Sequence, residues 1–501
     1  MNSRLRLWLI GIAGAALGVS IGANIADENY GLAVLLGLFS VSIVVSRTSR
    51  APPDVWLLGS ILFGYIVGNR GFAQLQPAAR IPLLPAEAVL LVTVPALALR
   101  MALKKVAGVR RDALNYAILV WMIAGMIRLP IDIGRYGVVA LRDFATIYYA
   151  AFFFIAQEFG AHSGSARVLI RTLTVAFLIL LPVVISTQIS PDFLVDHLTW
   201  RGIPIIYHKS DLIATSLAAG FFWLWTRMGR SRNWLWFGSA ATSLLLISAM
   251  ASPRAAMGAL ALTLILWLSV GRWRIAAAVF GTAAGGAVLA VAALAVTGRD
   301  LRTSAPYSAY EHAVSIFDVA GTGTYINGES GDPGDNNRFR IIWWRDVIDE
   351  TLSTSPVFGL GFGSDLTSRF LADYDLLGDE TFAARSPHSV VVTVFGRMGT
   401  VGLLAWLAVV AGIARMVWRL FKAGDPDDLG LASIVCVILI SACVGVVLES
   451  PMGAVIFWTA AGLANSRALG LGSSDRGSPK ANEGESPVAK SSPLLPHPSP
   501  R

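Results

Sequence analysis

The chain has 501 residues, of which 55% are hydrophobic and only 14% are Asp, Glu, Lys or Arg, and its mean hydropathy is +0.62. A soluble globular protein carries about 25% charged residues, so this composition excludes a water-soluble surface and indicates an integral membrane protein. The net charge of +8 would suggest nucleic acid as the partner of a soluble protein, but in a membrane protein basic residues report topology, and we expect no nucleic-acid partner.

Apolar stretches long enough to cross a lipid bilayer recur along most of the chain. We predict an all-α polytopic membrane protein with about 12–14 transmembrane helices. The predicted spans are 7–25, 30–46, 54–68, 83–103, 113–130, 143–158, 168–186, 211–226, 233–250, 255–271, 275–297, 399–418, 429–448 and 451–466. Both cysteines, Cys436 and Cys443, lie in one apolar stretch and suggest neither a disulfide framework nor a metal site.

Basic residues in the connecting loops predict the orientation. If the N-terminus is cytoplasmic, the cytoplasmic loops carry nineteen Lys and Arg residues, and the short outside loops carry eight. Cytoplasmic loops are enriched in these residues, so we expect both termini in the cytoplasm.

The chain divides into four predicted regions. N-terminal transmembrane helices occupy 1–297, a large outside loop occupies 298–398, and C-terminal transmembrane helices occupy 399–466. Residues 467–501 are rich in Ser, Pro and Gly, and we expect a disordered cytoplasmic tail there. The outside loop holds fourteen of the 32 acidic residues, and loops of this length are usually functional or disordered.

Within the outside loop, residues 300–337 are expected to be irregular, whereas the amphipathic stretch 338–352 predicts a helix. On that helix Arg340 and Trp344 are four residues apart and share a face. A guanidinium grips phosphate through two hydrogen bonds, and indole rings sit at the level of lipid headgroups. The pattern fits a site for an anionic, lipid-linked ligand, or an interfacial helix whose Arg residues meet headgroups.

Further polar residues stand at the predicted outer ends of spans. His388 could be a general base or a solvated helix end, because its ordinary pKa lies near neutrality. Arg254, two residues after Ser252, could reach a phosphate or snorkel to the interface. Three candidates remain. Lys209 and Asp211 are expected either to line a cavity or to anchor a span, and Glu449 is expected to be either a carboxylate on a substrate pathway or an exposed turn residue.

Two other patterns do not support a cofactor or a metal. The glycines of Gly359-Leu-Gly361-Phe-Gly363 lack the strand context of a dinucleotide site and predict a turn. Four aspartates could bind a divalent ion but do not form a calcium loop, and we expect no metal site. They are Asp332, Asp335, Asp373 and Asp375.

Taken in order, the motifs resemble the O-antigen ligase and polymerase family of bacterial surface-glycan assembly. That family shows an Arg four residues before a Trp, here Arg340 and Trp344. A Pro-x-x-Gly-x-Gly turn follows, here 356–361, and then a His eleven residues before Gly-x-x-Gly, here His388 before 399–402. An outside Ser-x-Arg at the start of a span, here 252–254, also fits.

The resemblance implies an inverting glycosyltransferase of the GT-C type of architecture, in the bacterial inner membrane. It implies transfer of a whole glycan from an undecaprenyl-diphosphate carrier to a hydroxyl of lipid A–core or of a growing glycan, without nucleotide, cofactor or metal. Arg340 and Arg254, with Arg338, would hold the diphosphate, and His388 would deprotonate the acceptor. Trp343 and Trp344 would lie at the bilayer surface or stack on sugar.

Several alternatives stay open. Within the family, the shared motifs do not separate a ligase from a polymerase or from a protein O-oligosaccharyltransferase. A transporter or flippase for an anionic or lipid-linked solute would carry charged residues near the midplane of the spans, and a non-catalytic scaffold would need neither the Arg nor the His. The oligomeric state is not predicted.

Overall fold

The computed structural model describes residues 18–24, 26–27, 51–75, 84–103, 105–231, 233–250, 253–297, 305–318, 333–373 and 385–470. These residues are almost entirely helical, which confirms the predicted all-α class. The helices are α3 Pro53–Val67, α4 Asn69–Ala73, α5 Pro85–Ala102, α6 Ala113–Tyr136, α7 Val138–Asp143, α8 Ala145–Tyr148, α9 Ala151–Gly160, α10 Ser163–Ile189, α11 Pro191–His197, α12 Ser210–Ser231, α13 Trp234–Ser248, α14 Arg254–Ser269, α15 Arg274–Thr297, α16 Ala305–Ser315, α17 Pro333–Thr354, α18 Ser368–Asp373, α19 Val390–Ala423, α20 Pro426–Cys443 and α21 Pro451–Ala468. A short antiparallel hairpin joins β1 Thr199–Trp200 to β2 Ile203–Pro204.

Within the described residues, seven helices are long and apolar enough to cross a membrane by length and composition, when α7, α8 and α9 are taken as one. Three shorter apolar helices, α3, α13 and α14, accompany them. Each predicted span from 54–68 onward coincides with helix in the structure. The first two predicted spans lie outside the described residues, apart from the helical segment 18–24.

The centre of the bundle is α21, which packs against α9, α20, α3 and α19. Three buried indoles meet there: the ring centroid of Trp121 on α6 lies 5.0 Å from that of Trp406 on α19 and 6.0 Å from that of Trp458 on α21. Such aromatic pairs add to the free energy of burial. They fix α19, which begins two residues after His388, against the rest of the bundle.

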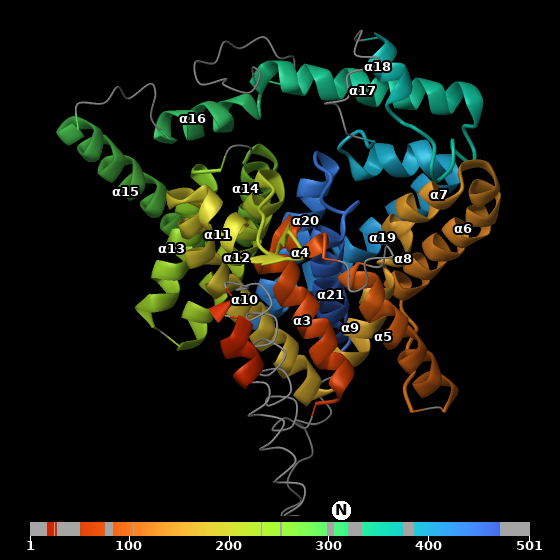
Figure 1. Cartoon of the computed structure of the whole chain (residues 1–501), viewed down its shortest axis with the longest axis horizontal. Coiled ribbons are helices and arrows are strands. Elements are labelled where there is room, and N and C mark those ends of the chain that lie inside the picture. Colours follow the sequence, from red (N-terminus) through yellow and green to blue (C-terminus); the bar gives the residue numbers. More distant parts are fainter. Residues whose placement is uncertain are drawn as a thin grey trace, which may run out of the picture.

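The outside loop forms a helical layer over one end of the bundle (Figure 1). The predicted helix over 338–352 lies within α17. The expectation of an irregular segment over 300–337 is wrong for residues 305–315, which form α16, and for residues 333–337, which begin α17. This helix gains its stability from tertiary packing, because it contacts α13, α14 and α17, and Glu311 and Ser315 are buried.

Ion pairs close the opposite end of the bundle. Arg227 on α12 lies 2.6 Å from Asp427, and Arg467 on α21 lies 2.6 Å from Asp425. All four residues were predicted on the cytoplasmic side. The two predicted sides therefore gather at opposite ends of the molecule, whereas the direction of the bundle in the membrane stays a prediction.

The turn after α17 is joined to α19 through the backbone. Residues 356–361 run beside residues 396–401, where the helix α19 is interrupted. The hydrogen bonds are Leu360 N–H to Gly396 O (2.7 Å), Gly361 N–H to Arg397 O (3.0 Å), Thr400 N–H to Pro356 O (2.9 Å) and Val401 N–H to Val357 O (3.1 Å). We call these two segments the turn–helix junction.

The junction depends on two glycines. Gly399 interrupts α19 with φ 63° and ψ −156°, and Gly359 has φ 75°. A Cβ atom on Gly399 would lie 2.5 Å from the backbone of Val357 and of Gly359. Only glycine avoids both the strained dihedral and this clash.

Residues of the N-terminal half hold the turn from the other side. Asp132 on α6 accepts the N–H of Phe362 at 2.7 Å, and Arg128 donates to the carbonyl of Gly359 at 3.0 Å. Asp143 on α7 accepts the N–H of Gly363 at 2.9 Å. The turn is thus fixed between α6, α7 and α19.

We expect Gly399→Ala to destabilise the protein by about 2 kcal/mol or more, because the cost of the positive φ and the cost of the clash between the new Cβ atom and the backbone add to each other. Thermal unfolding of the purified protein in detergent measures this change. The control is Gly258→Ala on α14, where a Cβ would meet nothing within 4 Å. Equal melting temperatures for the two variants would contradict the proposed role of the junction.

Candidate functional site

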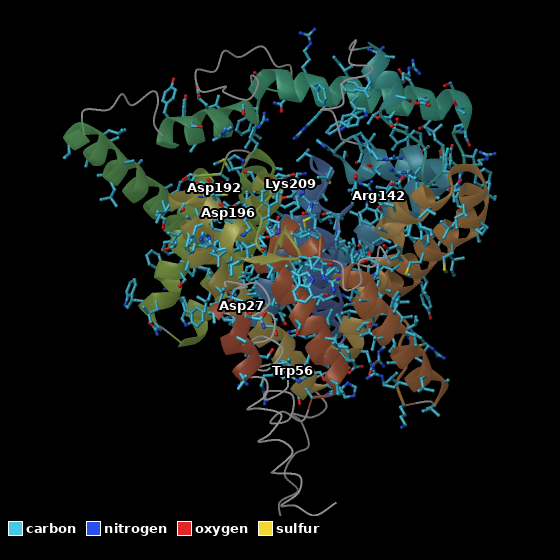
Figure 2. All side chains as sticks on the ribbon, viewed as in Figure 1. Asp27, Trp56, Arg142, Asp192, Asp196 and Lys209 are labelled. Atoms are coloured by element: carbon cyan, nitrogen blue, oxygen red, sulfur yellow. The ribbon has the colours of Figure 1, made fainter. Side chains whose placement is uncertain are left out.

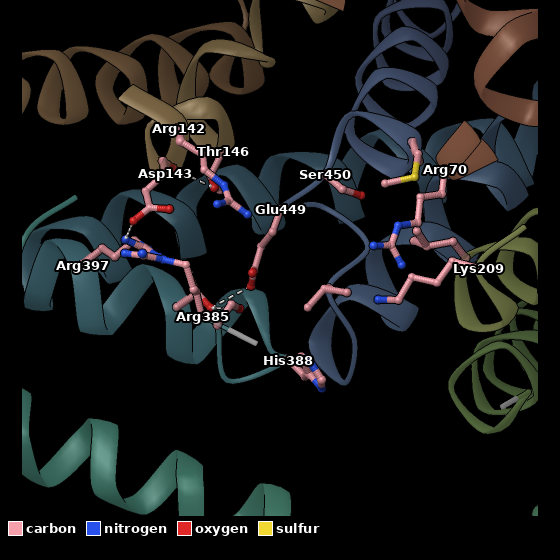
Figure 3. A pocket seen from close by; sticks show the side chains of 15 residues that line it. Arg70, Arg142, Asp143, Thr146, Lys209, Arg385, His388, Arg397, Glu449 and Ser450 are labelled. Atoms are coloured by element: carbon pink, nitrogen blue, oxygen red, sulfur yellow. Dashed lines mark hydrogen bonds and ion pairs between the residues drawn. The ribbon is translucent and has the colours of Figure 1, made fainter. Parts of the chain in front are cut away.

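A cavity of about 410 Å³ opens beneath the layer of α16, α17 and α18 (Figure 3). Its wall comes from α4, α7, α8, α12 and the residue before it, α19, α21, the segment 385–389 and the loop 444–450. The lining residues are Arg70, Arg142, Asp143, Thr146, Lys209, Leu212, Arg385, Ser386, His388, Thr393, Arg397, Val446, Glu449, Ser450 and Met452. The volume lies within the range of small-molecule sites, about 300–1,000 Å³.

His388 enters this cavity from a strained backbone position. Its φ is +55°, which is uncommon for a residue with a Cβ atom and costs about 1–2 kcal/mol. The preceding carbonyl, that of Pro387, accepts a hydrogen bond of 2.5 Å from Trp344 Nε1 on α17. The imidazole ring lies 5.6 Å from the ring of Trp343, measured between centroids. Trp344 therefore fixes the backbone that carries the predicted base.

The surroundings of His388 keep its imidazole neutral. Burial, then the positive charges of Arg340 and Lys209, lowers the pKa of His388 to about 4, while Asp211 opposes the shift. The ring is therefore unprotonated at pH 7, as a general base requires. None of the hydrogen bonds formed by the described residues involves this ring, so its nitrogen atoms remain accessible from the cavity.

Arg340 extends from α17 toward the loop after α20. Its Nη1 donates to the carbonyl of Val444 at 2.9 Å, whereas its Nε is buried without a partner among the described residues. Burial and the nearby charge of Arg254 lower its pKa to about 10, so the side chain is still a cation at pH 7. Arg254 donates to Asn337 Oδ1 at 3.4 Å. Two guanidinium groups are thus held near each other, an arrangement that favours an anionic ligand.

The structure brings most of the predicted site residues together. His388, Lys209 and Glu449 line one cavity, and Lys209 lies 3.4 Å from Asp211. Arg340 is close enough to His388 to shift its pKa. Ser252 lies outside the described residues.

The other predicted site residues do not line this cavity; they are Arg340, Arg254, Asp211, Arg338, Trp343 and Trp344. Arg338 is exposed on α17 and does not line the cavity. Trp343 is fully buried, donates its indole N–H to the carbonyl of Leu366 at 2.7 Å and stacks on Phe370. This environment favours a packing role for Trp343 over contact with sugar or lipid.

Glu449 lies in the loop between α20 and α21 and faces the start of α19. Its Oε1 accepts a hydrogen bond of 2.7 Å from Thr393. Burial raises the pKa of Glu449, although hydrogen bonds from Ser386 and Thr393 and the charge of Arg397 oppose the shift. This carboxyl group could hold or accept a proton near His388.

Sequence reasoning did not identify several cationic residues of the cavity. Arg70 and Arg142 were counted only as loop charges, and Arg385 and Arg397 were not selected. The predicted topology could have indicated them, because outside loops are usually poor in Lys and Arg. An Arg in a predicted outside loop, such as Arg142, is therefore a candidate for a role other than setting the topology, and Arg142 lines the cavity.

Among the residues that the structure describes, no group of three or more His, Cys, Asp or Glu side chains could hold a metal ion. Of the four aspartates considered above, Asp332 and Asp375 lie outside these residues. The charged groups of the cavity are mainly cationic, a set that suits anions.

The fold and the cavity define a class of protein: a polytopic helical membrane protein with a cation-rich cavity and a neutral histidine under its large loop. Residues 243–407 match the family model described as O-Antigen ligase, and this match confirms the resemblance to the O-antigen ligase and polymerase family. The matched segment covers about a third of the chain, from within α13 to within α19. None of the curated proteins compared with the chain matches it.

We expect Trp344→Phe to lower kcat by about 10- to 100-fold, because it removes the N–H that fixes Pro387 while keeping an aromatic ring. The KM for the donor should change little, which separates a positioning role from loss of binding. Steady-state kinetics of glycan transfer measure both constants. Trp418→Phe, at an exposed position on α19, is the matched control. A parallel rise in donor KM would contradict the positioning role.

We expect Lys209→Gln to move the acidic limb of the pH–kcat/KM profile to higher pH. Removing this positive charge stabilises the protonated imidazole, so the pKa of His388 rises and the neutral base is lost at a higher pH. Arg345→Gln, an 81% exposed position on α17, should leave the limb in place. If the acidic limb of the profile lies at the same pH in both variants as in the wild type, His388 is not the titrating base.

Proposed function

We propose that this protein transfers a whole oligo- or polysaccharide from an undecaprenyl-diphosphate carrier to an acceptor hydroxyl at the outer face of the inner membrane. The observation that carries the proposal is the cavity-lining His388, whose pKa is lowered by burial and by the nearby guanidinium of Arg340, together with the closeness of Arg254 to Arg340. The end of the bundle covered by this loop faces away from the cytoplasm, and both termini are cytoplasmic.

The guanidinium groups would bind the diphosphate of the donor. Arg340 has an unpartnered, buried Nε–H in addition to its outer nitrogen atoms, so it can offer a fork to two phosphate oxygens. Arg254 adds a second positive charge to the same place. These charges stabilise the diphosphate as it leaves with the electron pair of the glycosidic C–O bond.

His388 would act on the acceptor. Its neutral imidazole takes the proton of the acceptor hydroxyl as the oxygen forms a bond to the anomeric carbon. Because the leaving diphosphate departs from the opposite face of that carbon, the configuration inverts. The lipid diphosphate is already an activated leaving group, so this step needs neither a nucleotide sugar nor a metal.

The activity belongs to surface-polysaccharide assembly, as either a ligase or a polymerase. A ligase would use lipid A–core as acceptor and a polymerase would use a growing glycan. A gel of surface glycan and lipid-linked glycan from a deletion strain separates them. Polymer that accumulates on the lipid carrier identifies a ligase, and a single repeat on the surface identifies a polymerase.

Complementation of this strain tests the mechanism. We expect His388→Ala to lower transfer by about 10²–10⁴-fold, the usual contribution of a general base. Arg340→Ala should abolish transfer, and Arg340→Lys should stay poor because it keeps the charge but loses the fork.

Membrane levels of each variant are measured by immunoblotting, and Arg345→Ala serves as the control for loss of an arginine on α17. Wild-type glycan profiles from His388→Ala and Arg340→Ala would overturn the mechanism. An unchanged profile in the deletion strain itself, with no redundant enzyme, would instead favour a transporter.

A further inference from the structure

The cavity contains a second group of cations, at the end away from Lys209. Arg142 on α7 and Arg385 lie toward one end of the cavity, whereas Arg70 and Lys209 lie toward the other (Figure 3). His388 lies between the two groups in this view. Arg142 and Lys209 both lie at the end of the bundle under α17 (Figure 2).

In the proposed mechanism the donor diphosphate is held by Arg340 and Arg254, which are not among the residues that line the cavity. Lys209 and Arg340 both lower the pKa of His388, and Asp211 acts on His388 and on Arg340. These residues are therefore within electrostatic reach of one another. Arg142 and Arg385 lie on the other side of His388 from Lys209 (Figure 3), and neither is among the charges that shift these pKa values.

The charge of the second group is not balanced by its neighbours. Arg397 forms an ion pair with Asp143, which uses the nearest carboxylate. Glu449 is held by Thr393, and its raised pKa favours the uncharged form. The positive charges of Arg142 and Arg385 remain.

The hydrogen-bonding capacity of these two residues is also largely unused. Arg385 makes one long contact, 3.4 Å from Nη2 to the carbonyl of Gly363, and its Nε is buried without a partner among the described residues. Arg142 is exposed at the cavity wall, and no hydrogen bond or ion pair of its side chain is formed within the described part of the chain. A buried, unpaired guanidinium N–H is costly, and an anionic ligand would remove that cost.

We propose that Arg142 and Arg385 form a second anion subsite, which binds a phosphate or carboxylate group on the acceptor glycan. The inference rests on the proposed function. Arg142 and Arg385 lie on the side of His388 opposite Lys209 (Figure 3), and neither is among the residues assigned to the donor diphosphate, so an acceptor bound by them would approach His388 from that side. An anionic group there would align the acceptor hydroxyl with His388 and select acidic glycans over neutral ones.

The test is a transfer assay with purified full-length protein and the acceptor glycolipid extracted from its own host. Three forms of this acceptor are compared: intact, dephosphorylated with aqueous hydrogen fluoride, and carboxyl-reduced so that uronic acids become neutral. The variants are Arg142→Gln, Arg385→Gln and the double variant, with Arg345→Gln as the control for loss of an exposed arginine. The KM for donor and for acceptor is measured separately.

We expect the double variant to raise the acceptor KM by about 10- to 100-fold, the effect of losing charge-assisted hydrogen bonds. The donor KM should stay within about twofold of wild type. Removal of the anionic group from the acceptor should raise the acceptor KM of the wild type by a similar factor. The wild type and the double variant should then have the same acceptor KM. A phosphate is identified if hydrogen fluoride has this effect, and a carboxylate if reduction has it.

The subsite alone would be overturned by an acceptor KM unchanged in Arg142→Gln and in Arg385→Gln, or by wild-type use of both neutralised acceptors as efficiently as the intact one. A rise in donor KM equal to the rise in acceptor KM would also overturn it, because the residues would then serve the donor. Absence of transfer by the wild type to every acceptor would overturn the proposed function itself.

Discussion

The site depends on one constraint: an interrupted helix at the membrane surface must still satisfy its backbone hydrogen bonds. The interruption at Gly399 leaves N–H and C=O groups of α19 without helical partners, and an unsatisfied group in an apolar environment costs several kcal/mol. The turn over 356–361 supplies those partners. The same bonds fix the start of α19, and with it His388, against α17 and its Trp344.

The N-terminal half of the chain completes this arrangement, although the family match begins only at residue 243. Asp132 and Arg128 on α6 hold the turn through its backbone. Asp143 on α7 both accepts the N–H of Gly363 and pairs with Arg397. The carboxylate of Asp143 therefore connects the turn, α19 and the cavity wall. A substitution in the N-terminal helices that removes this carboxylate would displace residues of the matched region.

Much of this could be predicted from the sequence. Hydropathy identified the spans because each is a local property, and spacing identified Arg340 and His388 because their motifs lie within one loop. Residues such as Arg142 and Arg385 could not be found this way, because the cavity joins helices that are distant in the chain. Trp343 shows the opposite failure: its spacing marks it as a site residue, but the fold around Phe370 buries it.

The electrostatics of the cavity couple the base to the donor. Without a ligand, burial and then the charges of Arg340 and Lys209 lower the pKa of His388. A bound diphosphate brings negative charge near Arg340, so in the proposed mechanism the part of the shift caused by these cations decreases, and the pKa of His388 rises by that part. A base whose pKa lies nearer to the working pH transfers protons more effectively. The imidazole thus becomes a competent base when the donor is present, which favours attack by the acceptor only after the activated glycan is in place.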